Sequence, residues 1–221
     1  MIESLLKTIP MLIGLALSPL PLIAMFMLLL TPKAKQNSFA FLIGWLVGVY
    51  LIAGAVLLLP IPLEATWKSM GSSKNVQIII GVTMLLAAVI VKIKGTKKTD
   101  PIKIPKLFVH IDKFGFKRSI SLGFLMCTIN VKNLALVVAG AVQIKTALTS
   151  DLLDRGIASL LFTVLASSSM ITPVIIYNLS QEKLDTLFLK WRNFLIRNQT
   201  SILMLVLSFF GVLLIYMGLS S

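Results

Sequence analysis

The chain has 221 residues, of which 57% are hydrophobic and only 13% are charged, whereas soluble domains carry about a quarter charged residues. This composition excludes a water-soluble globule, and the high hydrophobicity also excludes a disordered chain. The net charge of +13 must lie between apolar stretches, where it meets anionic lipid headgroups. The one cysteine, Cys127, permits no internal disulfide. The sequence therefore predicts a polytopic membrane protein.

Six stretches are long and apolar enough to cross a bilayer, which takes about 20 residues as a helix. They lie at 9–30, 38–60, 76–94, 119–144, 156–179 and 200–219. Each is expected to be helical, because lipid offers no hydrogen-bond partners to an open backbone. The predicted fold class is all-α, with six transmembrane helices.

The distribution of basic residues predicts how the chain is oriented. The side reached after the first, third and fifth stretches carries fifteen of the 21 lysines and arginines, and the other side carries five. The remaining one, Lys132, lies inside the fourth stretch. Because positive charge is retained on the cytoplasmic face, we expect both termini to be extracytoplasmic.

The chain divides into a first three-helix repeat at 1–94, a basic cytoplasmic loop at 95–118 and a second three-helix repeat at 119–221. Because each repeat has an odd number of spans, the two repeats are inverted relative to each other, as in many transporters. Helices 1 and 4, the corresponding helices of the two repeats, are both expected to be interrupted.

Two cytoplasmic segments carry apolar residues at helical spacing. In 181–197 these residues are flanked by basic side chains and include Trp191, which favours an amphipathic helix in the membrane interface. The loop 95–118 allows two interpretations, a solvated loop or a second lipid-facing segment. The apolar residues of that second segment would be Leu107, Phe108, Ile111 and Phe114. His110 is interpreted as an ordinary surface histidine.

Helix 1 carries Ser18, Pro19 and Pro21 near its middle. Two prolines one residue apart remove two backbone donors and clash with the preceding turn, so a continuous helix is not expected. Helix 4 carries Thr128, Asn130, Lys132 and Asn133 at a similar depth. Disrupted helices at matching places in two repeats indicate a binding site at the membrane midplane.

Lys132 is the most informative single residue, because a charge at mid-membrane costs a few kcal/mol. No acidic residue lies within any of the six stretches. One interpretation is structural: the lysine reaches the interface or bonds to carbonyls of the broken helix. The functional interpretation is a counter-charge for an anionic headgroup, oriented by Asn130 and Asn133, since lysine is a compact point charge.

The fifth stretch adds Ser168 and Thr172, followed by Pro173. They are interpreted either as a proline kink whose freed carbonyls bond to hydroxyls or as a polar lining opposite Lys132. In the second stretch, Gly44 and Gly48 form a G-x-x-x-G motif, which favours close internal packing over a dimer face.

The spans hold no carboxylate pair, no His/Cys cluster and no Ser-His arrangement. Hydrolytic and metal chemistry need such groups within reach of one another. We therefore expect no enzyme, no catalytic residue, no metal site and no cofactor.

Four segments resemble a known family: LALSPLP at 15–21, TPKA at 31–34, FAFLIGWLVG at 39–48 and NVKNLAL at 130–136. They are similar to the GAP family, the peptidoglycolipid-addressing or sulfolipid-addressing proteins of the LysE exporter superfamily. The last segment resembles the superfamily's asparagine-proline-lysine signature, with Val131 in place of the proline. The layout of six spans with a basic central loop also agrees.

This resemblance implies a LysE-like fold and a bacterial inner-membrane exporter. The predicted function is an exporter or flippase-like carrier of an anionic lipid or glycolipid toward the cell envelope. The predicted substrate-binding residues are Ser18, Pro19, Pro21, Thr128, Asn130, Lys132, Asn133, Ser168 and Thr172.

Two alternatives stay open, a LysE-type exporter of a small solute (an amino acid or a metal ion) and a non-transporting scaffold of lipid-export machinery. For the small solute, Asp151 or Asp154 would have to be drawn inward. The expected partners are the lipid substrate and membrane lipids, and nucleic acid is not expected. A homodimer and lipid-synthesis or lipid-export proteins remain open as further partners.

Overall fold

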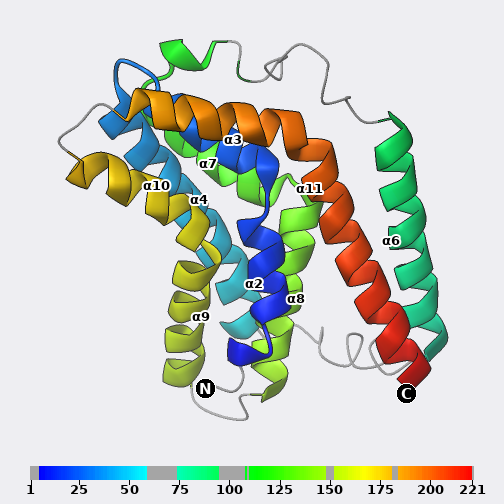
Figure 1. Ribbon diagram of the computed structural model, residues 1–221. Helices are drawn as coiled ribbons and strands as arrows, with labels where there is room; N and C mark the ends of the chain where they lie inside the picture. The colour runs from blue at the N-terminus through cyan, green and yellow to red at the C-terminus, as the bar shows by residue number, and fades with distance from the viewer. Residues whose placement is uncertain are drawn as a thin grey trace. The chain divides into compact units, whose positions relative to one another are not determined.

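A computed structural model describes residues 5–58, 74–94, 108, 110–147, 152–180 and 184–220. These residues form helices and connecting turns, and no strand occurs among them (Figure 1). The helices, in chain order, are α2 (Ile9–Ala16), α3 (Pro19–Leu29), α4 (Ala34–Leu58), α6 (Lys74–Lys94), the short 3₁₀ helix η2 (Ile111–Lys113), α7 (Phe116–Thr128), α8 (Val131–Ala147), α9 (Leu152–Ala166), α10 (Ser168–Leu179) and α11 (Asp185–Ser220). The predicted all-helical class is confirmed for the described residues.

Three of the described helices, α4, α6 and α11, are each long and apolar enough to cross a membrane. Three further pairs pass the same test together but are bent at a short break: α2 with α3 by 48°, α7 with α8 by 68°, and α9 with α10 by 64°. The described helices therefore provide three spans, or up to six if each bent pair is one span. This apolar composition is that of a membrane protein.

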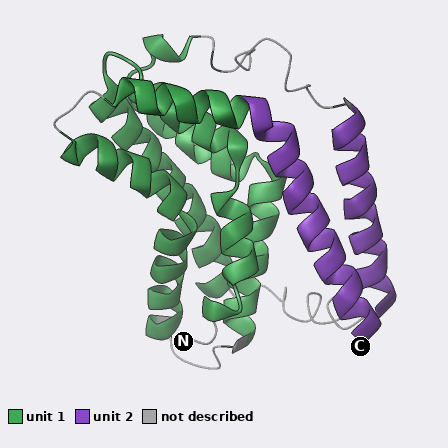
Figure 2. Ribbon diagram, in the orientation of Figure 1, with its two compact units in different colours: residues 1–60, 102–196 green, residues 61–101, 197–221 purple. Residues whose placement is uncertain are grey.

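The chain forms two compact units (Figure 2). Unit 1 comprises residues 1–60 and 102–196, and unit 2 comprises residues 61–101 and 197–221. In unit 2, α6 and the C-terminal part of α11 approach closely, because a Cβ on Gly81 would lie 2.7 Å from the carbonyl oxygen of Gly211. The predicted repeats at 1–94 and 119–221 and the loop between them stay a prediction.

The core of unit 1 is built around α4, which contacts α7, α8 and α9. Where α4 crosses α7, a Cβ on Gly44 would lie 2.0 Å from the carbonyl oxygen of Ile120, and one on Gly123 would lie 2.1 Å from that of Phe41. The two backbones therefore touch, as small residues in membrane helices permit. Gly48 likewise faces Cys127, so the prediction that Gly44 and Gly48 serve internal packing is confirmed.

The helix α11 differs from the two separate segments expected at 181–197 and 200–219. It is continuous from Asp185 to Ser220, and residues 181–183 lie outside the described part of the chain. Continuity is reasonable because neither proline nor glycine occurs between Asp185 and Phe210, so nothing in this sequence terminates a helix.

The apolar stripe of the expected amphipathic segment is partly covered by protein. The Phe188 ring lies 5.7 Å from Phe26 on α3 and 6.0 Å from Tyr177 on α10. Leu195 is also buried, whereas Trp191 is 53% exposed. One side of this segment therefore packs within unit 1, and the other side is available to lipid.

The loop predicted at 95–118 is described only at residue 108 and from residue 110 onward. Phe108 and Ile111 are buried, η2 contacts α3, and the Asn37 side-chain amide donates to the Phe114 carbonyl at 2.9 Å. Both interpretations, a solvated loop and a lipid-facing segment, are therefore wrong for Phe108 and Ile111, which are buried. His110 is exposed, as expected.

Candidate functional site at two helix breaks

The first break separates α2 from α3 at residues 17–18. Ser18 has an extended conformation (φ −93°, ψ 100°), and α3 begins at Pro19. Pro19 and Pro21 therefore occupy the first and third positions of α3. The N–H groups at these positions have no hydrogen-bond partner within a helix, so proline removes no helical bond there. The prolines therefore lie at the start of α3 and do not kink a continuous helix.

The second break separates α7 from α8 at residues 129–130. The Asn130 side-chain oxygen accepts a hydrogen bond from the Lys132 backbone N–H at 3.2 Å, which is the bond that an N-capping asparagine makes. The Thr128 hydroxyl donates to the Phe124 carbonyl at 2.9 Å, within its own helix. Asn130 therefore caps the N-terminus of α8, and the Thr128 hydroxyl is hydrogen-bonded within α7.

Side chains from the two breaks meet in one hydrogen-bonded network. The Lys132 Nζ donates to the Gly14 carbonyl at 2.8 Å and to the Ser18 Oγ at 2.7 Å. Ser18 Oγ in turn donates to Asn133 Oδ1 at 2.6 Å. Asn133 Nδ2 donates to the Met126 carbonyl at 3.2 Å. We call Ser18, Lys132 and Asn133 the break network.

The break network is deeply placed, since Ser18 and Asn133 are fully buried. The Gly14 carbonyl is one that a continuous helix would pair with the N–H of Ser18, so the break leaves it for Lys132. Neither hydrogen bond of the Lys132 ammonium goes to a carboxylate. An ammonium has three donors, and two of them are used by these neutral acceptors.

The helices that follow the two breaks, α3 and α8, differ in the number of free N–H groups at their N-termini. In the first turn of α3, Pro19 and Pro21 have no N–H. The first turn of α8 has no proline and places Val131 at an exposed position. Free N–H groups and the helix dipole favour an anion at a helix N-terminus. The break network therefore has its charge and most of its donors on the α8 side.

The third break lies at Ser167, six residues before Pro173, which is inside α10. Ser168 and Thr172 are exposed, and the Thr172 hydroxyl donates to the Ser168 carbonyl at 2.8 Å. Within the described residues, no hydrogen bond joins either side chain to Lys132. Their place in a lining opposite Lys132 stays a prediction.

The bond from Lys132 to the Gly14 carbonyl is of the kind that the structural interpretation of Lys132 predicts, a bond to a carbonyl at a helix break. The sequence analysis did not identify Gly14 as the residue. The usable signal is position: a carbonyl four residues before a helix break loses its backbone donor. Ser167 was not among the predicted site residues, although its hydroxyl is fully buried without a hydrogen-bond partner.

The fold and the break network define a class, a helical membrane protein in which two bent helix pairs meet at a lysine. The family model SfLAP, described as Sap, sulfolipid-1-addressing protein, matches residues 9–220. The chain belongs to this family, in agreement with the resemblance drawn from its motifs. Comparisons with curated proteins and with solved structures found no match.

Proposed function

We propose that the protein is an exporter or flippase-like carrier of an anionic lipid or glycolipid. The observation that carries this proposal is the Lys132 ammonium, which bonds to Gly14 and Ser18 and has no carboxylate partner among the described residues. The family description names a sulfolipid, and a sulfated lipid has the anionic headgroup that this charge would match.

The chemistry favours an anionic cargo because a lone ammonium at mid-membrane is costly. Two neutral acceptors reduce that cost without neutralising the charge. A sulfate or phosphate group brought to the Lys132 ammonium would offset the charge with a charge-assisted hydrogen bond. Asn130 and Asn133 hold the lysine backbone and its partner Ser18 in place, so they position the charge.

The arrangement of the breaks supports two inverted repeats. Each break leaves two residues outside the helices, 17–18 and 129–130. In each break the second residue is polar, Ser18 or Asn130, and directly precedes the helix that follows. With each bent pair counted as one span, the chain has three spans on each side of the central loop, and the repeats have opposite orientations.

The proposed orientation has both termini outside a bacterial inner membrane. The charge bias rests on the sequence and on the positive-inside rule. The cations Lys33, Lys35, Lys117 and Arg118, all assigned to the cytoplasmic side, are exposed, as residues facing water or lipid headgroups should be.

The small-solute alternative is less well supported. A cationic solute needs an acidic site, and Asp154 is exposed in the first turn of α9. Asp151 lies outside the described residues. The scaffold alternative depends on the loop at 95–118, most of which also lies outside them. Loss of complex formation with intact lipid binding after deletion within this loop would favour a scaffold.

The direct test is transport in liposomes that contain fluorescent phosphatidylglycerol or phosphatidylcholine. Dithionite bleaching reports movement of the probe between leaflets, measured with and without an imposed pH gradient. We expect Lys132→Ala to slow phosphatidylglycerol movement by about tenfold to a hundredfold, because a hydrogen bond to a charged group is worth about 1.5–3 kcal/mol. Insertion into the membrane should be unchanged.

Ser18→Ala is the matched control, because it removes one partner of Lys132 but keeps the charge. We expect this variant to transport phosphatidylglycerol within about threefold of wild type. Equal losses in the two variants would show that transport depends on an intact break network and not on the charge of Lys132 itself. Wild-type transport by Lys132→Ala would remove the counter-charge role altogether.

A further inference from the structure

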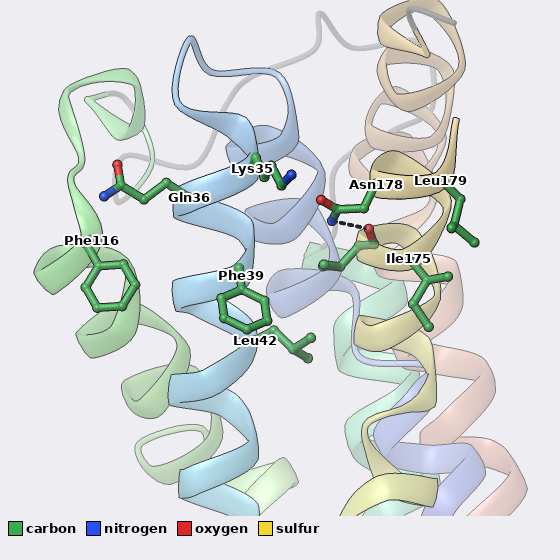
Figure 3. A pocket seen from close by; sticks show the side chains of 9 residues that line it. Lys35, Gln36, Phe39, Leu42, Phe116, Ile175, Asn178 and Leu179 are labelled. Carbon is green, nitrogen blue, oxygen red and sulfur yellow. Dashed lines mark hydrogen bonds between the residues drawn. The ribbon is translucent and has the colours of Figure 1, made fainter. Parts of the chain in front are cut away.

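A groove in unit 1 lies between α4 and α10 and is bordered by α7 (Figure 3). Its volume is about 580 Å³. The apolar part is lined by Phe39 and Leu42 of α4, Phe116 of α7, and Val174, Ile175 and Leu179 of α10. The groove is open to its surroundings along one side, so a chain-like ligand can enter it from the bilayer.

The polar residues of the groove come from two helix ends. Lys35 and Gln36 line it from the first turn of α4, and Asn178 lines it from the last turn of α10. The Asn178 amide nitrogen donates to the Val174 carbonyl at 2.8 Å (Figure 3), which leaves its oxygen free to accept. Lys35 is exposed, and the N-terminus of α4 adds a favourable field for negative charge.

The groove thus pairs an apolar wall with a cation at one end. An anionic lipid has the matching form, since its acyl chain fits the wall and its headgroup fits the ammonium. None of the described residues that line the groove is acidic, so its described polar end carries the positive charge of Lys35 and no negative charge.

We propose that this groove binds one acyl chain of an anionic membrane lipid, with the headgroup at Lys35. The site is separate from the break network, because none of its lining residues belongs to that network. Its role as a loading site rests on the proposed function, whereas binding of the lipid does not. By the predicted orientation, the site opens to the cytoplasmic leaflet, from which an exporter would take its cargo.

The test uses the full chain in nanodiscs with phosphatidylglycerol or phosphatidylcholine that carries a diazirine on one acyl chain. After photolysis, mass spectrometry maps the labelled residues. We expect the phosphatidylglycerol probe to label α4 and α10 within the groove at least fivefold more than the phosphatidylcholine probe. A lysine near an anionic headgroup is worth about 1 kcal/mol, which corresponds to about fivefold in binding.

Two pairs of variants provide matched controls. Lys35→Gln should lower phosphatidylglycerol labelling by about fivefold, whereas Lys33→Gln, also exposed and outside the groove, should change it by less than twofold. Ile175→Trp should fill the groove and reduce labelling by both probes. Ile176→Trp changes a neighbour of similar exposure, 43% against 49%, and should leave labelling intact.

Several outcomes would overturn the proposal. Equal labelling by the two probes would show an ordinary lipid-facing surface, and equal effects of the two lysine variants would show general surface charge. A dimer in nanodiscs that is lost in Ile175→Trp would assign the groove to a second copy of the chain. Failure of the proposed transport is distinguishable, because Lys132→Ala should lose transport while keeping groove labelling.

Discussion

The two helix breaks start the following helix with different residues and contribute different groups to the break network. At the α2–α3 break, prolines start α3 and the chain contributes acceptors, the Gly14 carbonyl and the Ser18 hydroxyl. At the α7–α8 break, an asparagine cap starts α8 and the chain contributes a cation. A proline break frees carbonyls without adding charge, so the charge has to come from the other break. The asymmetry makes the site a single positive centre rather than two equal halves.

Removal of the Asn133 side chain should have the largest effect on stability, because this side chain links the two helix breaks. Asn133→Ala leaves the buried Ser18 hydroxyl and the Met126 carbonyl without their partners. We expect a loss of about 2–4 kcal/mol in unfolding free energy, measured as a fall in melting temperature in detergent. Thr128→Val, which removes a bond local to α7, is the control and should lower stability by less than about 1 kcal/mol. Equal shifts would show that the link between breaks is not stabilising.

Ser18→Ala should have a smaller effect on stability. It removes a donor to Asn133 and one of two acceptors of Lys132, but the Gly14 carbonyl still holds the ammonium. We expect a loss of about 1–2 kcal/mol, seen in the same melting experiment. A double variant with Asn133→Ala should lose less stability than the sum of the two single losses, because each substitution removes the same Ser18–Asn133 hydrogen bond. Strict additivity would contradict the Ser18–Asn133 hydrogen bond.

Val131→Pro should have the smallest effect on stability, and it tests whether α8 can begin with a proline as α3 does. Val131 is the first residue of α8, as Pro19 is of α3, and it is 78% exposed. Proline is favoured at this position of a helix, so we expect a change within about 1 kcal/mol, in the stabilising direction. The melting temperature should therefore hold or rise slightly. A marked fall would mean that the N–H of Val131 has a partner that the two breaks do not share.

Sequence reasoning located the helices well because membrane spans are long and apolar. It also placed Ser18, Asn130, Lys132 and Asn133 at two breaks that come together in the structure. The sequence predicted that Lys132 could bond to a carbonyl of a broken helix, but not that this carbonyl belongs to Gly14, because the choice depends on how the two bent pairs pack. The bend at Ser167 rather than Pro173 was missed because proline is tolerated inside a helix when neighbours satisfy the freed carbonyl.

Local patterns were less informative where tertiary packing decides the outcome. The spacing of Phe108 and Ile111 fits a lipid-facing stripe as well as a buried one, and in the structure both side chains are buried. The groove at Lys35 joins residues of α4, α7 and α10, which are far apart in the sequence and carry no common motif.

The central claim is that Lys132 binds the headgroup of an anionic lipid. Native mass spectrometry of the protein extracted gently from its own membranes, with wild type beside Lys132→Ala, tests it most directly. We expect the wild type to retain one more anionic lipid per chain than the variant, and the mass of that lipid would identify the cargo. If both proteins retain the same mixture of bulk phospholipids in the same number, the lysine does not bind a lipid headgroup, and the account of the break network as a carrier site is contradicted.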